Sequence, residues 1–73
     1  MKKHKADLSE WRLDFDLVAN KYFFYGKIYK DELKRFEDGK RIRTSELLKI
    51  DFQTMTAETK NTIYNLKDMG YNL

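Results

Sequence analysis

This 73-residue chain has one histidine and no cysteine, two of the residue types that most often serve as catalytic bases and nucleophiles. His4 is the only histidine, and it stands in a basic N-terminal stretch where we expect a solvated side chain and no pocket for a general base. Thr44 and Ser45 offer hydroxyl groups, but a nucleophilic serine needs an adjacent base, and neither a second histidine nor a suitable lysine pair is present. We therefore expect these hydroxyls to bond to backbone at a strand bend, and we predict no catalytic residue.

Carboxylates and thiols are the remaining candidates for chemistry. Asp14 and Asp16 would share a strand face and could hold a hard cation such as Mg²⁺ together with water, although an ordinary solvent face explains their spacing better. Glu37-Asp38-Gly39 lacks the further ligands of a calcium loop and indicates a β-turn. Cysteine is absent, which excludes disulfides, thiolate zinc sites and thiol catalysis. We predict no metal, no cofactor and no enzymatic activity.

A basic and aromatic set in the middle of the chain is the candidate binding surface. The net charge is only +3, but residues 21–49 contain nine basic and five acidic residues. Aromatic side chains beside cations are typical of protein-docking hot spots and of surfaces on which single-stranded nucleic acid stacks. The candidate binding residues are Tyr25, Lys27, Tyr29, Lys40, Arg41 and Arg43.

The elements that position these side chains read mainly as strands. Apolar and polar residues alternate strictly over 11–16, so Trp11, Leu13 and Phe15 would share one strand face. A helix remains an alternative, because apolar residues also recur at three- and four-residue spacing between Leu8 and Tyr22. Residues 22–29 are rich in aromatic and β-branched types and predict a central strand.

Glycine and polar clusters mark the boundaries of the remaining elements. Gly26 inside the central strand indicates a bulge or a close backbone approach. Residues 30–36 predict a loop or a single helical turn. Residues 37–40 predict a tight turn and 41–45 a strand, and alternation continues over 48–52. Residues 55–69 fit either one helix that ends before Gly70 or two short strands with a turn at 59–62.

Two sequence boxes carry a resemblance to known proteins. Residues 35–45 read Arg-Phe-Glu-Asp-Gly-Lys-Arg-Ile-Arg-Thr-Ser, and residues 59–66 read Thr-Lys-Asn-Thr-Ile-Tyr-Asn-Leu. With Gly26-Lys27-Ile28-Tyr29 before them, they resemble a scattered group of small phage and prophage proteins with the pattern R-F-x-D-G-x-x-I-x-T-S … T-x-N-T-x-Y-x-L. The resemblance spans about residues 22–66, and this chain departs from the pattern by a longer polar segment at 30–34.

The resemblance implies a phage setting and an all-β domain, which favours strands in the last third. Most such proteins have no assigned activity, and some small phage proteins of this size block host defence systems, including CRISPR nucleases. The resemblance transfers neither a target nor a site residue to this chain.

These observations predict a single, mainly β domain over residues 1–73. We expect about five short antiparallel strands in a curled sheet or open barrel, with residues 11–66 as the folded core and residues 1–9 as a flexible basic tail. The alternative is an α+β fold with an N-terminal or C-terminal helix.

The predicted function is non-catalytic binding to a host protein or protein–nucleic acid complex, extending to inhibition of a host defence nuclease. The alternative is a small nucleic-acid-binding module that uses the basic and aromatic face. We expect no membrane span, a location in the host cytoplasm, and either a monomer or a dimer paired through edge strands.

Overall fold

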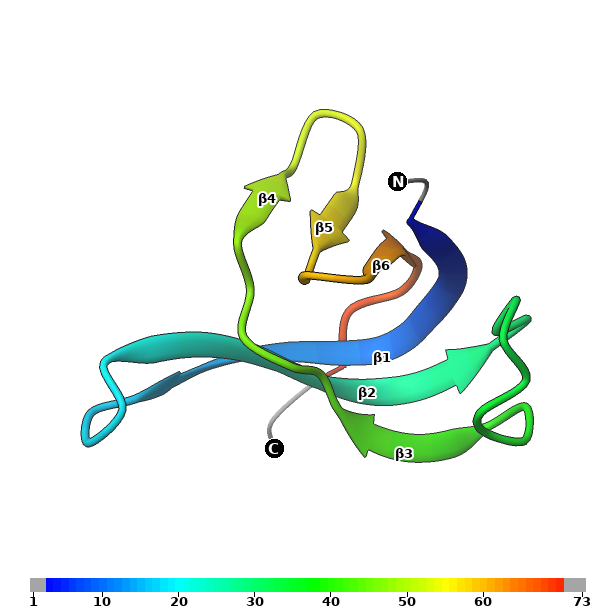
Figure 1. The fold of residues 1–73 in the computed structure, drawn as a ribbon, viewed down its shortest axis with the longest axis horizontal. Coiled ribbons are helices and arrows are strands. Elements are labelled where there is room, and N and C mark those ends of the chain that lie inside the picture. The colour runs from blue at the N-terminus through cyan, green and yellow to red at the C-terminus, as the bar shows by residue number, and fades with distance from the viewer. Residues whose placement is uncertain (1–2, 71–73) are drawn as a thin grey trace.

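The computed structural model describes residues 3–70, which form one six-stranded mixed sheet without any helix (Figure 1). The strands lie in the spatial order β3-β2-β1-β6-β5-β4 and do not close into a barrel. Their bounds are β1 (His4–Asp16), β2 (Lys21–Tyr29), β3 (Lys40–Arg43), β4 (Lys49–Asp51), β5 (Thr56–Glu58) and β6 (Thr62–Leu66).

The prediction of a small, mainly β domain is therefore confirmed, with two corrections of detail. The described sheet has six strands rather than about five, and the pair β1 and β6 is parallel while every other pair is antiparallel. Both helical alternatives are wrong, because residues 8–16 lie in β1 and residues 55–69 contain β5 and β6. The predicted turn at 59–62 joins these last two strands.

A β-bulge interrupts the pairing of β1 with β2. The register shifts between Ser9 and Arg12, so that Glu10 and Trp11 together lie opposite the single residue Gly26. Glu10 adopts a φ of 50°, the left-handed conformation that a bulge of this kind requires. The extra residue reverses the alternation of β1, and as a result Leu8 and Trp11 both face the core although they are three residues apart.

Two glycines allow other segments to approach this bulge. A Cβ atom on Gly26 would lie 2.8 Å from the Ser9 carbonyl oxygen and 2.9 Å from Leu8 Cγ. A Cβ atom on Gly70 would lie 2.5 Å from the Glu10 carbonyl oxygen. The predicted bulge or close approach at Gly26 is thus confirmed, with the bulge itself on the neighbouring strand.

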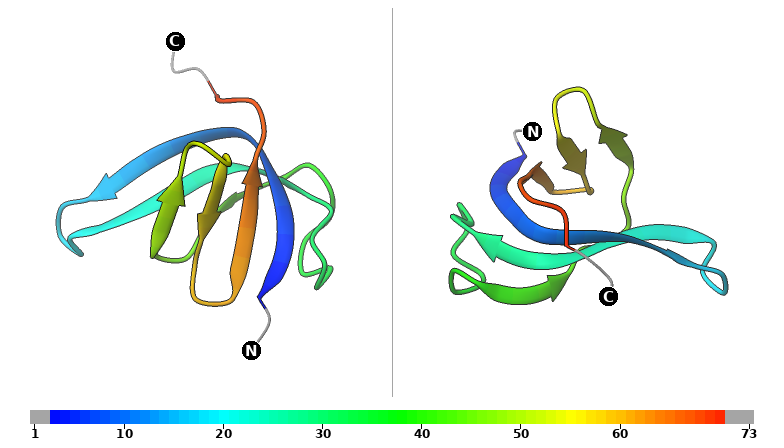
Figure 2. Two further views of the ribbon diagram at one scale, coloured as in Figure 1. Left: turned by 90° about the horizontal axis from the view of Figure 1, so that it is seen from above. Right: turned by 180° about the vertical axis from the view of Figure 1, so that it is seen from behind.

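The sheet bends along β1, so that β4, β5 and β6 stand over one side of β1, β2 and β3 (Figures 1 and 2). The core lies inside this bend. Its fully buried large side chains include Leu8, Phe24 and Ile28, and Trp11 packs edge-on against Phe24 with a centroid separation of 5.4 Å. Beyond the bend, β1 and β2 continue together as a hairpin arm that ends at residues 17–20.

The prediction of a flexible tail over residues 1–9 is wrong from His4 onward. Residues 4–8 pair in parallel with β6, and the His4 amide donates a hydrogen bond to the Asn61 carbonyl at 3.0 Å. Ala6 and Leu8 are buried against the core, which explains why this charged segment is held. The folded part therefore extends beyond 11–66 at both ends, from His4 to Gly70, while residues 1 and 2 lie outside the described residues.

The first sequence box holds the strands together. Asp38 accepts a hydrogen bond from the Lys30 amide at 2.9 Å, and Gly39 has a φ of 88° in the turn before β3. Thr44 is buried, and its hydroxyl accepts from the Phe24 amide at 3.0 Å and donates to the Ser45 carbonyl at 2.9 Å. These contacts confirm that the Thr44 hydroxyl bonds to backbone where β3 ends.

An ion pair organises the loop between β2 and β3. The buried Asp31 carboxylate accepts from Arg35 Nε at 3.0 Å, from Arg35 Nη2 at 2.9 Å and from the Arg35 amide at 2.9 Å. These hydrogen bonds hold the pKa of the Asp31 carboxyl below its usual value. The loop also reaches β1, because the Glu32 amide donates to the Lys5 carbonyl at 2.9 Å.

We expect Gly26→Ala to destabilise the fold by about 1–3 kcal/mol, because a backbone oxygen at the bulge cannot move away from the added methyl group. Urea unfolding followed by circular dichroism measures this loss, with Lys60→Ala in an exposed turn as the control. A Gly26→Ala variant as stable as the control would show that the bulge does not constrain the sheet.

We expect Asp31→Asn to destabilise the fold by about 1–3 kcal/mol at neutral pH, since it leaves the Arg35 guanidinium without its carboxylate. Because the pKa of the Asp31 carboxyl is lower in the folded than in the unfolded state, this group stabilises the fold at pH values above its unfolded-state pKa. The stabilisation is lost as the pH falls through the folded-state pKa. The difference between wild type and variant should therefore shrink below about pH 4. Urea unfolding at several pH values measures this difference in unfolding free energy, and Glu37→Gln at an exposed position is the control. A difference that stayed constant with pH would contradict the prediction.

Candidate functional site

Five of the six predicted binding residues come together on the convex face of the β1–β2–β3 layer, which we call the outer face. Tyr25 lies opposite Arg43, and Lys27 lies opposite Arg41. Tyr29 is two residues beyond Lys27 on β2 and therefore lies on the same face as Tyr25 and Lys27. Lys40 is the exception, because it lies opposite the core residue Ile28 and is therefore on the other face of β3 from Arg41 and Arg43.

Acidic residues of β1 neutralise much of this outer face. Glu10 Oε2 lies 3.0 Å from Lys27 Nζ, and Glu10 Oε1 lies 3.3 Å from Arg41 Nη2. Asp16 Oδ2 lies 3.5 Å from Arg43 Nη2. The hydrogen bond from Lys27 lowers the pKa of the Glu10 carboxyl, and the Ala19 and Val18 amides, with Arg43, lower that of Asp16.

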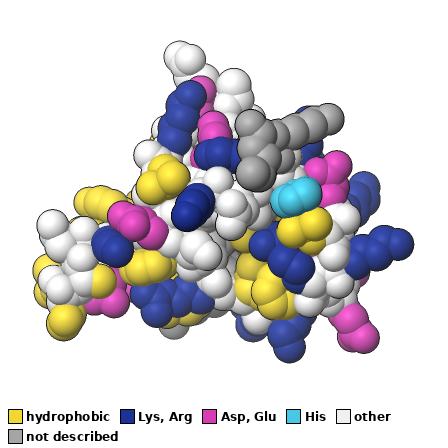
Figure 3. Space-filling view, in the orientation of Figure 1, with side chains coloured by type: hydrophobic (Ala, Val, Ile, Leu, Met, Phe, Trp, Pro, Cys, Tyr) yellow, Lys and Arg dark blue, Asp and Glu magenta, His cyan; other side chains and the backbone are white. Residues whose placement is uncertain are grey.

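Aromatic rings on the outer face are also occupied by the chain's own cations. The Arg43 guanidinium carbon lies 3.8 Å from the centroid of the Phe23 ring, and the Arg12 guanidinium carbon lies 5.9 Å from that of Tyr25. Figure 3 shows basic and acidic side chains intermingled over the visible side of the molecule. The predicted basic patch exists as a cluster of residues, but it is a network of internal pairs rather than a field of free positive charge.

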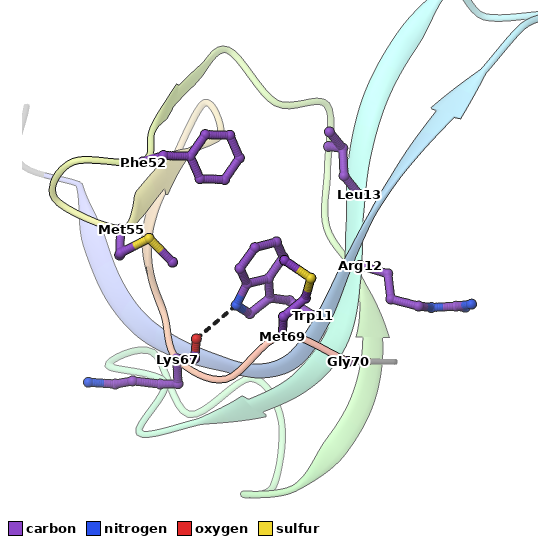
Figure 4. Close-up of a pocket in the computed structure, with 8 residues that line it drawn as sticks. All are labelled: Trp11, Arg12, Leu13, Phe52, Met55, Lys67, Met69 and Gly70. Atoms are coloured by element: carbon purple, nitrogen blue, oxygen red, sulfur yellow. Dashed lines mark hydrogen bonds between the residues drawn. The ribbon is translucent and has the colours of Figure 1, made fainter. Parts of the chain in front are cut away.

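The concave side of the sheet carries a cleft that the sequence analysis missed. Its volume is about 620 Å³. Trp11 and Met69 form its floor, Leu13 stands on one side, and Phe52 and Met55 stand on the other (Figure 4). The remaining lining residues are Arg12, Lys67 and Gly70.

The apolar side chains of the cleft remain largely open to solvent. Leu13 is 44% exposed, Phe52 56% and Met69 55%. The Phe52 ring stacks on the Trp11 ring with a centroid separation of 6.2 Å, and the Trp11 indole N–H donates to the Lys67 carbonyl at 3.0 Å. The indole therefore has its polar atom satisfied, and because Trp11 is only 4% exposed its ring forms a packed floor on which the exposed side chains stand.

Backbone contacts hold the cleft floor in place. The Trp11 amide donates to the Asp68 carbonyl at 3.3 Å, and the Gly70 amide donates to the Trp11 carbonyl at 2.8 Å. The Ser9 hydroxyl donates to the Asp68 carboxylate on the same segment. This segment, residues 67–70, thereby continues along β1 beyond the end of β6.

The apolar surface extends from the cleft along the hairpin arm. Phe15 and Tyr22 pair across the arm with a centroid separation of 4.7 Å, and both are at least a third exposed. At the tip, Leu17 is 84% and Val18 99% exposed. Asp16 Oδ1 accepts from the Val18 and Ala19 amides at 3.0 Å each, which fixes the conformation of the tip.

Residues 3–70 contain no group of three or more histidine, cysteine or carboxylate side chains placed to hold a metal ion. None of their segments forms a helix long and apolar enough to cross a bilayer. His4 and Asp14 lie near opposite ends of β1, and Ser45 follows the end of β3, so the three do not assemble into a common site.

Comparison of the chain with protein families, with curated proteins and with solved structures finds no match. The candidate site therefore depends on the geometry of this chain alone.

We expect the chain to bind single-stranded DNA weakly and to lose it at moderate salt, because Glu10 and Asp16 compete with phosphates for the outer-face cations. Glu10→Gln should strengthen this binding by about threefold to tenfold, since it releases Lys27 and Arg41. Gel-shift titrations at two salt concentrations measure both effects. Glu37→Gln changes the net charge by the same amount and is the control. Tight, salt-resistant binding by the wild type would show that Glu10 and Asp16 do not neutralise the outer face.

Proposed function

We propose that this chain is a non-catalytic binding protein that docks on another protein through the apolar cleft. The observation that carries the proposal is the set of exposed apolar side chains gathered there, namely Leu13, Phe52 and Met69 around the Trp11 ring. A contiguous exposed apolar patch costs solubility unless a partner covers it, and such patches mark interaction sites.

The composition of the cleft favours a protein partner over nucleic acid. Interface hot spots are rich in tryptophan and other aromatic residues seated in apolar surroundings with a polar rim. The exposed Phe52 ring, supported from beneath by the buried Trp11 ring, fits this description. The charged members of the lining, Arg12 and Lys67, point away from the floor (Figure 4). The nucleic-acid alternative has less support, because the outer-face cations already have carboxylate partners.

The resemblance of the two sequence boxes extends the proposal to its biological setting. In that setting the partner is a host protein in the cytoplasm, and a defence nuclease is the class of target to test first. The cleft is not built from the boxes, whose central residues have structural roles. Gly39 forms the turn before β3, and the buried side chains are Thr44, Thr62 and Tyr64.

The proposal is tested by affinity capture from a bacterial host lysate, identification of the retained protein and titration of the purified pair. Phe52→Ser and Met69→Ser should each weaken the affinity by about tenfold or more, since both side chains lie in the cleft. Leu48→Ser is the matched control, because Leu48 is 61% exposed but does not line the cleft.

Two results would contradict the proposal. One is the absence of any stoichiometric protein partner, and the other is a partner whose affinity is unchanged in both cleft variants. Circular dichroism of each variant confirms that its fold is retained.

A further inference from the structure

The far half of β1 carries a row of unpaired backbone groups. In an antiparallel pair, residues alternate between pointing their backbone groups at the partner strand and pointing them away. On β2, the Phe24 and Tyr22 carbonyls accept from the Thr44 and Leu47 amides on the side away from β1, at 2.8 and 2.9 Å. Their β1 partners must point away from β2 in the same manner.

Those partners are Leu13, which lies opposite Phe24, and Phe15, which lies opposite Tyr22. Their amides and carbonyls face the side of β1 that residues 67–70 cover only as far as Trp11. Within residues 3–70, neither Leu13 nor Phe15 has a hydrogen-bond partner on that side. We call this stretch the open edge.

The open edge and the cleft lie next to each other. Trp11, Leu13 and Phe15 have the same phase on β1, and Trp11 and Leu13 line the cleft. A strand added at the open edge would place the side chains opposite Leu13 and Phe15 on this same face. Alternate residues of that strand would therefore enter the apolar space beside Trp11 and Phe52.

The geometry points to strand addition as the docking mode: an extended peptide segment of the partner pairs with the backbone of Leu13 and Phe15 and inserts alternate apolar side chains into the cleft. An extended peptide is the one chemistry that satisfies both features, because it supplies backbone donors and acceptors in register with apolar side chains. This inference rests on the proposed function and specifies its mechanism.

The charge at the rim indicates the flanks of this peptide. Lys67 lines the cleft with its side chain pointing outward (Figure 4), and its ammonium has no carboxylate within ion-pair distance among the described residues. An acidic residue beside the apolar positions of the partner would complement it.

A second copy of this chain meets a like-charge contact in the register that joins Leu13 to Phe15. A symmetric antiparallel pair that joins Leu13 of one chain to Phe15 of the other is centred on Asp14. The two Asp14 carboxylates would then face each other directly across the strands, which is destabilising. An external strand avoids this contact.

The test uses a panel of short synthetic peptides in which valine, leucine or phenylalanine alternates with threonine between terminal glutamates. Binding is followed by the fluorescence of Trp11, the only tryptophan, and by hydrogen exchange of the Leu13 and Phe15 amides. We expect at least one peptide to bind, to slow exchange at both amides, and to bind more weakly when lysine replaces its glutamates.

Two matched controls separate backbone pairing from apolar contact. N-methylation of the peptide at the residues that face β1 keeps its side chains and should weaken binding about tenfold or more. In the protein, Leu13→Pro removes the outward amide without touching the β1–β2 hydrogen bonds, whereas Leu13→Ala removes only the side chain. The proline variant should lose more affinity than the alanine variant, with circular dichroism as the check on folding.

Four results would overturn strand addition while leaving the proposed function to its own test by host-protein capture. The first two are failure of every peptide to bind and equal binding of the N-methylated peptide. The other two are a wild-type dimer that Leu13→Pro dissociates and peptide binding that appears only after removal of residues 71–73. The last two results would assign the open edge to a second copy or to the chain's own C-terminus.

Discussion

The bulge at Glu10 and Trp11 is the constraint on which the rest of the structure depends. One extra residue on β1 reverses the alternation of that strand, so Leu8 and Trp11 both reach the concave side. The same distortion bends the sheet and directs the hairpin arm away from β6. The floor of the cleft, the open edge and the position of Glu10 between Lys27 and Arg41 all follow from this single irregularity.

The sequence predicted the strands well where alternation was local. Residues 22–29 and the turn at 37–40 were recognisable from residue type alone, whereas residues 55–69 fitted either a helix or two strands and only the resemblance favoured strands. The competing helix over residues 8–22 arose because a bulge separates inward-facing residues by three positions, which is also helical spacing. The first five residues of β1, His4–Leu8, had no local signal, because they pair with β6, a segment far away in the sequence.

The candidate site was harder to predict than the fold. The sequence grouped Tyr25, Lys27, Arg41 and Arg43 as one candidate surface, and the strand register places them on one face of the sheet. Their counter-ions come from β1, and composition counted within one third of the chain could not reveal these partners. The cleft combines Trp11, Phe52 and Met69 from three distant segments, so it exists only after the sheet has bent. The sequence signal that was available for the cleft was the presence of apolar residues beside irregular positions of the chain.

The parallel pairing of β1 with β6 has a consequence for how the molecule is made. Hairpins such as β1–β2 can form within microseconds of leaving the ribosome, whereas the ladder between β1 and β6 must await synthesis of residues 62–66. Until then His4–Leu8 has no neighbour on its β6 side. Non-local strand pairing of this type slows folding to the order of milliseconds to seconds, so the nascent chain passes through a period in which its longest strand can associate with foreign polypeptides.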